Sequence, residues 1–210
     1  MGPRLKSRAM PRPARPAPAA RRAPNEVRIV GGQWKRTRLP VADKPGLRPT
    51  PDRVRETLFN WLGQDLGGWR CLDVFAGTGA LGFEAASRGA SQVLLVEQDP
   101  ELVSTLRALK ARLAADTVEV RRANGLSVLK EFAGAGLDLV FLDPPFDAGL
   151  FDKAVAAAVP ALGPDGLVYL ESPAPWSAAQ AAAAGLSIHR HLKAGAVHAH
   201  LLGRAADPGP

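Results

Sequence analysis

Short apolar runs that alternate with helical segments constrain the fold of this chain more than any other feature. Runs of this length are typical of strands buried inside a parallel sheet, and their alternation with helices predicts right-handed crossovers. The predicted strands are 71–76, 93–96, 118–120, 137–142 and 167–170. The predicted helices are 80–88, 101–113, 127–132, 151–159 and 178–184. Residues 186–193 and 196–202 predict a closing antiparallel hairpin that turns near Ala194-Gly195.

A glycine turn follows the first of these strands. Gly77-Thr78-Gly79 separates that strand from the next helix, and Glu97, twenty residues past Gly77, ends the second strand. Glycines at such a turn let the backbone approach a ligand, and an acid that ends the next strand can hold ribose hydroxyls. A lone Gly-x-Gly is common, but strand, turn, helix, strand and acid together predict a nucleoside-binding site.

The strand 137–142 ends in Asp143-Pro144-Pro145-Phe146. Proline has no N–H for a sheet ladder and favours an extended residue before it, so the strand must stop here. A carboxylate, proline carbonyls and an aromatic ring are left at the carboxyl end, the edge where open α/β sheets bind ligands. These groups suit a planar amino group; a plain strand-ending turn with a capping Asp143 is the structural alternative.

Composition excludes several classes of protein. The chain has 210 residues and is 46% hydrophobic, which is enough for a substantial core. No apolar stretch approaches the roughly 18 residues of a membrane span. Cys71 is the only cysteine, so a disulfide within the chain or a thiolate metal cluster is excluded, and a cytoplasmic protein is expected.

The net charge of +7 is concentrated near the N-terminus. Residues 1–25 hold seven Lys or Arg and no acid, residues 26–62 hold eight and four, and residues 63–210 hold twelve and sixteen. The three parts therefore carry +7, +4 and −4. A basic leading third on a mildly acidic body predicts a polyanionic partner, although a solubilising tail would also explain residues 1–25.

Four segments follow from these patterns. Residues 1–25, rich in Pro, Ala and Arg, are predicted to be a disordered basic tail. Residues 26–62 form an N-terminal hairpin and helix extension, 63–203 the main α/β domain, and 204–210 a flexible C-terminus.

The predicted N-terminal hairpin pairs an alternating run at 27–32 with residues 37–41. Trp34 lies among its basic residues, and bases stack on aromatic and guanidinium planes, so the hairpin is a candidate RNA-binding surface. A Trp34 that packs the hairpin onto the body is the alternative. The candidate RNA-binding residues here and in the following segment are Arg28, Trp34, Lys35, Arg36, Arg38 and Arg48.

A helix is predicted after residue 49. Thr50 can cap it, Pro51 suits its first position and Asp52 favours the positive end of its dipole. Its predicted apolar face consists of Val54, Leu58, Trp61 and Leu62. Basic residues flank the helix start, where an anionic group is readily held: Arg48, Arg53 and Arg55.

Several of these motifs, in the same order, resemble the bacterial RsmD family over about residues 26–203. They are 27–34, 48–62, Leu72-Asp73-Val74-Phe75-Ala76-Gly77-Thr78-Gly79 and Asp143-Pro144-Pro145-Phe146. The last two would suit many amino-group methyltransferases, and the first two narrow the match. The resemblance implies a Rossmann-like class I S-adenosylmethionine-dependent methyltransferase fold, with a mostly parallel seven-stranded sheet, a C-terminal antiparallel hairpin and a small N-terminal β-hairpin and helix extension. It also implies methylation of the exocyclic N2 of a guanine in 16S ribosomal RNA.

The resemblance implies a role for each matching residue. Asp73, Phe75, Gly77 and Gly79 would line the methionine part of S-adenosylmethionine, Thr50 and Arg53 would hold its carboxylate, Glu97 its ribose and Asn124 its adenine amino group. Thr78 and Gln98 would complete the cofactor site. Asp143 and the carbonyl of Pro144 would accept the guanine amino hydrogens, Pro145 would stiffen the turn and Phe146 would stack on the base.

Such a reaction gives S-adenosylhomocysteine and requires no metal. The expected partner is 16S ribosomal RNA, a small ribosomal subunit or an assembly intermediate, met by a monomer away from membranes. Two alternatives use the same residues. One is another amino-group methyltransferase, acting on adenine N6, cytosine N4 or a glutamine amide; the other is a non-catalytic RNA-binding protein of ribosome assembly.

Four histidines lie in the predicted closing hairpin. A turn near Ala194-Gly195 would place His191 opposite His198 and His189 opposite His200 on one face. Four imidazoles there could bind a transition metal, although no carboxylate or cysteine joins them and coincidence on a half-exposed face is the simpler interpretation.

Overall fold

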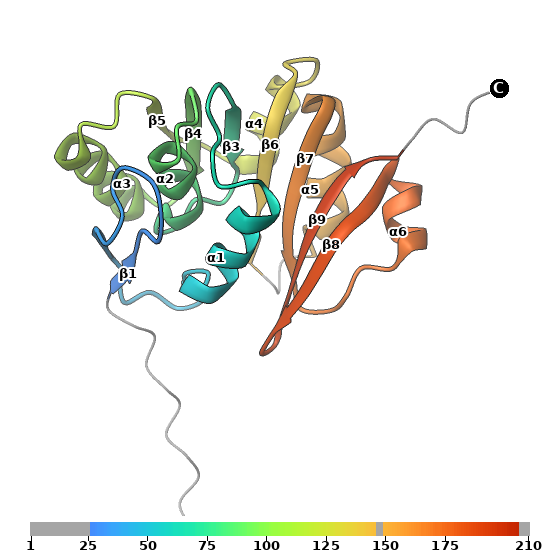
Figure 1. The fold of residues 1–210 in the computed structure, drawn as a ribbon, viewed down its shortest axis with the longest axis horizontal. Helices are drawn as coiled ribbons and strands as arrows, with labels where there is room; N and C mark the ends of the chain where they lie inside the picture. Colours follow the sequence, from blue (N-terminus) through green and yellow to red (C-terminus); the bar gives the residue numbers. More distant parts are fainter. Residues whose placement is uncertain (1–25, 146–148, 206–210) are drawn as a thin grey trace, which may run out of the picture.

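The structure is a computed structural model, and it describes residues 26–145 and 149–205. Predictions for residues 1–25 and 206–210, including the basic tail, and for Phe146 lie outside the described residues. Figure 1 shows a central sheet with helices on both faces, and the N-terminal extension lies on one of these two faces.

Seven strands form the central sheet in the order β5-β4-β3-β6-β7-β9-β8. The first five of these pair in parallel, and β9 is antiparallel to both β7 and β8. The strands are β3 (Arg70–Asp73), β4 (Gln92–Glu97), β5 (Val118–Arg122), β6 (Leu137–Leu142), β7 (Leu162–Ser172), β8 (Leu186–Ala194) and β9 (Val197–Arg204). The predicted fold class is therefore confirmed.

Two hydrophobic clusters cover the two faces of this sheet. One joins it to α1 (Asp52–Trp61), α2 (Ala80–Ser87) and α3 (Pro100–Leu113). The other joins it to α4 (Gly125–Glu131) and α5 (Phe151–Ala158), and α6 (Ala178–Ala183) packs on β8. Alternate residues of each buried strand serve opposite clusters; for example, Phe141 belongs to the first and Leu142 to the second.

The strand order reverses between β3 and β6. From β3 the chain proceeds outward to β4 and β5, and then returns to place β6 on the other side of β3. In open α/β sheets, ligands bind outside the carboxyl ends of the strands at such a switch point. Asp73 ends β3 and Asp143 directly follows β6, so both lie at this edge.

The N-terminal extension begins with a short antiparallel hairpin of β1 (Glu26–Arg28) and β2 (Arg38–Pro40). The predicted cap of the following helix is wrong. Pro51, not Thr50, is the N-cap of α1, and no side chain caps this end. Thr50 is buried, and its hydroxyl donates a hydrogen bond to the carboxylate of Glu171.

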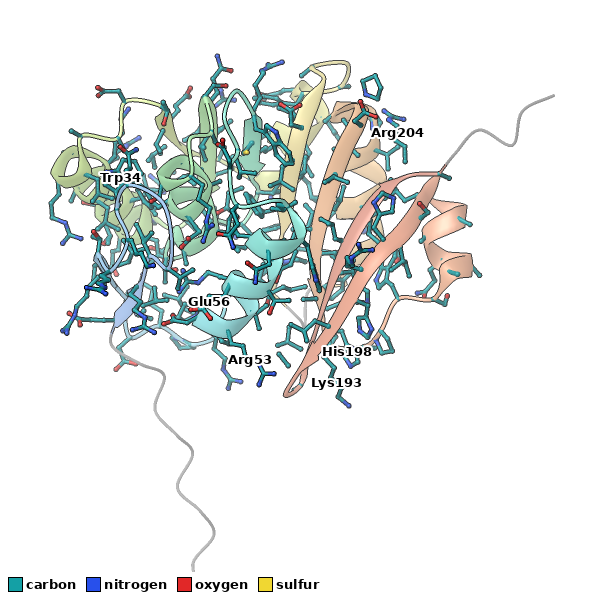
Figure 2. The ribbon with its side chains drawn as sticks, viewed as in Figure 1. Trp34, Arg53, Glu56, Lys193, His198 and Arg204 are labelled. Carbon is teal, nitrogen blue, oxygen red and sulfur yellow. The ribbon has the colours of Figure 1, made fainter. Side chains whose placement is uncertain are left out.

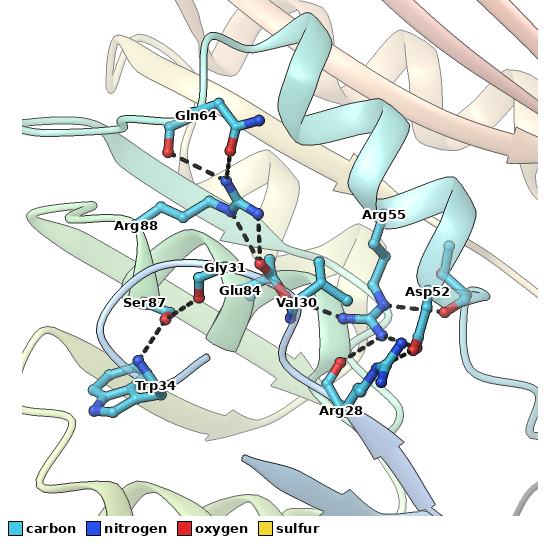
Figure 3. Close-up of polar contacts among 12 residues, drawn as sticks. Arg28, Val30, Gly31, Trp34, Asp52, Arg55, Gln64, Glu84, Ser87 and Arg88 are labelled. Carbon is cyan, nitrogen blue, oxygen red and sulfur yellow. Dashed lines mark hydrogen bonds and ion pairs between the residues drawn. The ribbon is translucent and has the colours of Figure 1, made fainter. Parts of the chain in front are cut away.

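A buried carboxylate, Glu84 of α2, holds the extension against the main domain (Figure 3). Its two oxygens accept hydrogen bonds from Nη1 of Arg55 at 3.1 Å, from Nε of Arg88 at 2.9 Å and from the backbone N–H of Val30 at 2.8 Å. Arg55 also donates to the carbonyl oxygen of Arg28 at 2.6 Å. One carboxylate therefore ties together α1, α2 and the hairpin.

This network corrects the prediction that Arg55 helps to hold an anionic ligand at the start of α1. The Arg55 side chain has no exposed surface and is bound to Glu84, Asp52 and two backbone carbonyls. Burial lowers the pKa of Arg55, and the nearby carboxylates of Glu84 and Asp52 oppose this. Its charge is neutralised inside the protein.

The closing hairpin has a different register from the predicted one. Ala194 pairs with Val197, so the turn residues are Gly195 and Ala196, and His191 faces His200. His189 lies at a bulge, where its ring packs over Gly203. The ring centroids of His191 and His200 lie 4.6 Å apart in a stacked arrangement, and Nε2 of His191 lies 2.9 Å from Nδ1 of His198. Among the described residues, no group of His, Cys, Asp or Glu is arranged to hold a metal ion.

The C-terminal boundary also differs slightly from the predicted one. Arg204 completes β9, and its guanidinium donates to the carbonyls of Val159, Leu162 and Gly163 at 3.0–3.1 Å. The prediction that a flexible C-terminus begins at residue 204 is therefore wrong for Arg204, because this side chain secures the end of the sheet.

Replacing Glu84 by alanine should destabilise the protein by about 3–5 kcal/mol, because Arg55 and Arg88 would remain buried without their counter-ion. Urea unfolding monitored by fluorescence would measure the loss. The matched control is Glu131→Ala, which removes an exposed ion pair with Arg121 and should cost about 0–1 kcal/mol. Equal losses for the two variants would contradict the role of Glu84.

Candidate active site

The glycine turn after β3 brings backbone close to the switch point. Gly77 and Gly79 have φ values of +52° and +76°, which strain any residue with a side chain. A Cβ at Gly79 would lie 2.6 Å from Leu106 and 2.7 Å from Phe83, so this position has no room for one. Thr78 between them is buried. The turn therefore requires both of its glycines, as predicted from the sequence.

Asp73 lies beneath this turn. It is buried, and its Oδ2 accepts a hydrogen bond from the N–H of Gly82 in α2 at 3.0 Å. The pKa of Asp73 is raised to about 7, mainly by burial and also by the nearby carboxylate of Glu97, although hydrogen bonds from the backbones of Gly82 and Phe75 oppose the rise. Its observed contacts secure the turn, and direct contact with a cofactor stays a prediction.

Glu97 closes the site on the side of β4. Its Oε2 accepts from the N–H of Gly77 at 3.0 Å, and its Oε1 accepts from the N–H groups of Gln98 and Asp99 at 2.8 and 2.9 Å. A carboxylate has about four acceptor positions. Glu97 is half-buried, so it retains acceptor capacity toward a ligand beside the glycine turn. Gln98 is exposed next to it.

Asn124 follows β5 as predicted, but its observed contact is local. Its Oδ1 caps α4 by accepting from the N–H of Ser127 at 3.1 Å. A further hydrogen bond to an adenine amino group stays a prediction. Phe75, half-buried, packs against the second hydrophobic cluster and lies beside Gly125.

A strap of residues 41–50 crosses the glycine turn. Leu47 lies over Gly77, where a Cβ would be 3.1 Å from its methyl group. Nζ of Lys44 lies 2.6 Å from Asp99 and 2.7 Å from Glu101, at the start of α3. Arg53 is exposed at the start of α1 and points away from the body in Figure 2. Thr50, by contrast, is buried and bonded to Glu171, so of these two residues Arg53 is the accessible one for a carboxylate.

Asp143 is half-buried at the end of β6, Pro144 is buried and Pro145 is exposed. Burial raises the pKa of Asp143 well above its ordinary value, and the nearby carboxylates of Glu171 and Asp73 add to the rise. No ion pair is formed by Asp143 with any other described residue. The edge of the site therefore offers acceptors without a fixed counter-ion.

Glu171, at the end of β7, is the residue that sequence reasoning missed. It is 3% exposed, and its Oε1 accepts a hydrogen bond from the hydroxyl of Tyr169 at 2.7 Å. Burial raises its pKa, while hydrogen bonds from Tyr169 and Thr50 act against the rise. The signal was present in the sequence, because Glu171 ends an apolar run as Glu97 and Asp143 do.

The predicted RNA-binding residues divide into paired and unpaired groups. Arg28 forms an ion pair with Asp52 at 2.6 Å, and Arg38 forms one with Glu26 at 3.0 Å. Lys35, Arg36 and Arg48 are exposed and form no ion pair within the described part of the chain. Arg28, Lys35 and Arg36 also line a hollow of about 150 Å³.

Trp34 is only partly buried and packs against the first hydrophobic cluster, and its backbone N–H donates a hydrogen bond to Oγ of Ser87 at 2.9 Å. Its position supports the interpretation that it packs the hairpin onto the body (Figure 3). Among the helices that the structure describes, none is long and apolar enough to span a membrane.

Comparison with known proteins matches this architecture to one family. The family model described as Conserved hypothetical protein 95 matches residues 27–203. The curated protein named Ribosomal RNA small subunit methyltransferase D from Escherichia coli is 42% identical over 184 residues, covering 87% of this chain and 92% of that protein. Its namesake from Haemophilus influenzae is 43% identical over 157 residues, covering 71% and 80%.

A solved structure supports the same assignment. The E. coli structure named "Putative methyltransferase yhhF" superposes with a TM-score of 0.73 at 38% identity, covering 87% of this chain and 99% of that one. The matched region includes the glycine turn, Glu97, the Asp143-Pro144 edge and the N-terminal extension. The chain therefore belongs to the RsmD family.

Proposed function

We propose that this protein transfers a methyl group from S-adenosylmethionine to the exocyclic N2 of a guanine in 16S ribosomal RNA. The observation that carries the proposal is the position of Asp143 and Pro144, which follow β6 directly across the switch point from the Gly77-Thr78-Gly79 turn of β3. Acceptors for an amino group thus face a turn suited to a nucleoside cofactor. The relatives named as small-subunit rRNA methyltransferases support the choice of RNA.

The cofactor site fits the residues present. The positive φ of Gly77 and Gly79 keeps the turn free of side chains, and Glu97 retains acceptor capacity for ribose hydroxyls. Arg53 is accessible for the cofactor carboxylate, and Phe75, Asn124 and Gln98 complete the proposed site. When bound, S-adenosylmethionine supplies an electrophilic methyl group on a sulfonium.

The protein's part in the reaction is to orient a poor nucleophile. The lone pair of a guanine amino group is delocalised into the ring. Asp143 and the carbonyl oxygen of Pro144 would accept its two hydrogens and turn the nitrogen toward tetrahedral geometry, which frees the lone pair. Correct orientation of the reacting groups can supply about 7–11 kcal/mol. The carboxylate of Asp143 also stabilises positive charge that develops on the nitrogen.

The RNA must present the base outside its stack, and unstacking favours a single-stranded or distorted region. Lys35, Arg36 and Arg48, exposed on the N-terminal extension, would contact phosphates, with the basic tail as a further contact. We expect a cytoplasmic monomer that acts on 16S ribosomal RNA in a small subunit or an assembly intermediate. Mapping of methylated nucleosides in ribosomal RNA from cells with and without this gene tests the proposal and identifies the nucleotide.

Two other functions would use the same site. A methyltransferase for adenine N6, cytosine N4 or a glutamine amide would transfer methyl groups to those acceptors instead of guanine. A non-catalytic assembly protein would bind RNA but no S-adenosylmethionine. Isothermal titration with S-adenosylmethionine distinguishes a non-catalytic assembly protein from the proposed enzyme. Mapping of methylated nucleosides distinguishes a methyltransferase for another amino group from one for guanine N2.

Asp143→Ala should abolish methyl transfer but leave the affinity for S-adenosylmethionine within about tenfold, because Asp143 acts on the base. Tritiated methyl incorporation and calorimetric titration would measure the two effects. Asp165→Ala is a suitable control, since Asp165 is exposed in β7 before the buried part of that strand. A large loss of cofactor affinity in Asp143→Ala would mean that Asp143 serves the cofactor instead.

Replacing Lys35 and Arg36 together by glutamine should weaken RNA binding and flatten its salt dependence. For each phosphate that the protein no longer neutralises, the slope of log K against log salt should fall in magnitude by about 0.7–0.9. Filter binding over a range of KCl concentrations gives this slope. Arg121→Gln is the control, because Arg121 lies on the edge strand β5 and is already paired with Glu131; an equal effect there would indicate only non-specific charge.

A further inference from the structure

Glu171 and Asp143 occupy equivalent places on neighbouring strands. The parallel pairing of β6 and β7 sets Leu142 beside Leu170, and the next residue on each strand is one of these two acids. Adjacent strands lie about 4.8 Å apart. By alternation, both acids are on the face of the sheet that carries Phe141 and Tyr169, the face covered by α1.

Neutral donors hold Glu171 in this buried position. The hydroxyl of Tyr169 donates to it at 2.7 Å, and the hydroxyl of Thr50 donates from the segment before α1. The ring of Tyr169 is itself fixed edge-on against Phe141, with centroids 6.2 Å apart. Among the described residues, neither Glu171 nor Asp143 forms an ion pair.

The other charged groups around the pair lie on three elements. Asp73, from β3, adds negative charge beside Asp143. The charge of Arg55, from α1, opposes the rise in the pKa of the Tyr169 hydroxyl, and this guanidinium is itself neutralised by Glu84 and Asp52. On β9, Ala199 faces Glu171, and the neighbouring His198 and His200 belong to the opposite face by strand alternation.

Two carboxyl groups this close, without a cation, cannot both ionise easily, so the pair retains a proton to a higher pH than either acid alone. The hydroxyls of Tyr169 and Thr50 stabilise the ionised form of Glu171. The proton that the pair shares is therefore bound mainly by Asp143, the member of the pair that the RNA base would contact.

We propose that Glu171 is a positioning residue that sets the pH at which Asp143 loses its proton and becomes able to accept hydrogens from the target amino group. This inference rests on the proposed function. As guanine N2 forms its bond to the methyl carbon, the methyl–sulfur bond breaks and both of its electrons go to sulfur. One N–H bond of N2 then breaks, its proton moves to the Asp143 carboxylate, and water carries it away.

The test is the pH profile of methyl transfer by the full chain. For the natural protein, kcat/KM should rise with pH along a limb displaced above the ordinary carboxyl range. Glu171→Gln keeps the size of the side chain but removes its charge, so this limb should move to lower pH by roughly one unit or more. Glu119→Gln, an exposed glutamate on the far edge strand β5, is the matched control and should not move it.

Tyr169→Phe provides a graded second variant. Loss of the hydroxyl donor makes ionised Glu171 less stable, so Glu171 takes more of the shared proton and Asp143 less. The limb should therefore move in the same direction as in Glu171→Gln, but by a smaller amount. An unmoved limb in both variants, or movement to higher pH, would overturn the proposal.

Thermal stability without cofactor or RNA gives a readout that does not need activity. An acid whose pKa is raised by folding contributes stability below its unfolded pKa, and this contribution is lost as pH rises through its folded pKa. Glu171→Gln should therefore show a smaller fall in Tm between pH 5 and pH 8 than the natural protein. Equal falls would contradict the shared proton. Absence of methyl transfer to guanine N2 by the natural protein would instead refute the proposed function, while the Tm comparison would still decide whether the pair exists.

Discussion

The carboxylate of Glu84 is the interaction on which the arrangement of the N-terminal extension depends. A buried acid is costly unless its acceptor positions are filled, and here two guanidinium groups and a backbone N–H fill them. The donors come from α1, from Arg88 at the C-cap of α2 and from the chain after β1. Because the same extension supplies Leu47 above Gly77 and Thr50 beside Glu171, this buried network sets the position of residues on both sides of the site.

The buried strands and the glycine turn were predictable because they leave local signatures. Residues 137–142 were predicted and observed as β6, and the turn at Gly77-Thr78-Gly79 requires its glycines for reasons of φ and space that any sequence with this fold must satisfy. The acids that end the strands were predictable for the same reason, since a carboxylate after an apolar run marks the carboxyl edge. Most of the candidate site can therefore be recognised from short, continuous stretches of the sequence.

What the sequence could not predict depended on partners distant along the chain. The apolar pattern of α1 does not reveal that Arg55 is buried, because its partner Glu84 lies 29 residues away. Thr50 satisfies every local rule for a helix cap, yet its hydroxyl bonds to Glu171. The histidine pairing failed because the turn lies one residue later than expected, and such a change in a hairpin alters every cross-strand partner.

The two buried glutamates have different partners: guanidinium groups neutralise Glu84 in the extension network, whereas neutral hydroxyls donate to Glu171 at the site. This difference affects the pKa of Asp143. An arginine beside Glu171 would stabilise both carboxylates and give Asp143 an ordinary pKa. Tyr169 and Thr50 stabilise Glu171 without adding positive charge, so Asp143 still experiences its negative neighbour. Arg55, the buried arginine of α1, has its charge neutralised by Glu84 and Asp52. The exposed cations Lys35 and Arg36 of the hairpin form no ion pair with another described residue, and the edge at Asp143 and Glu171 remains acidic.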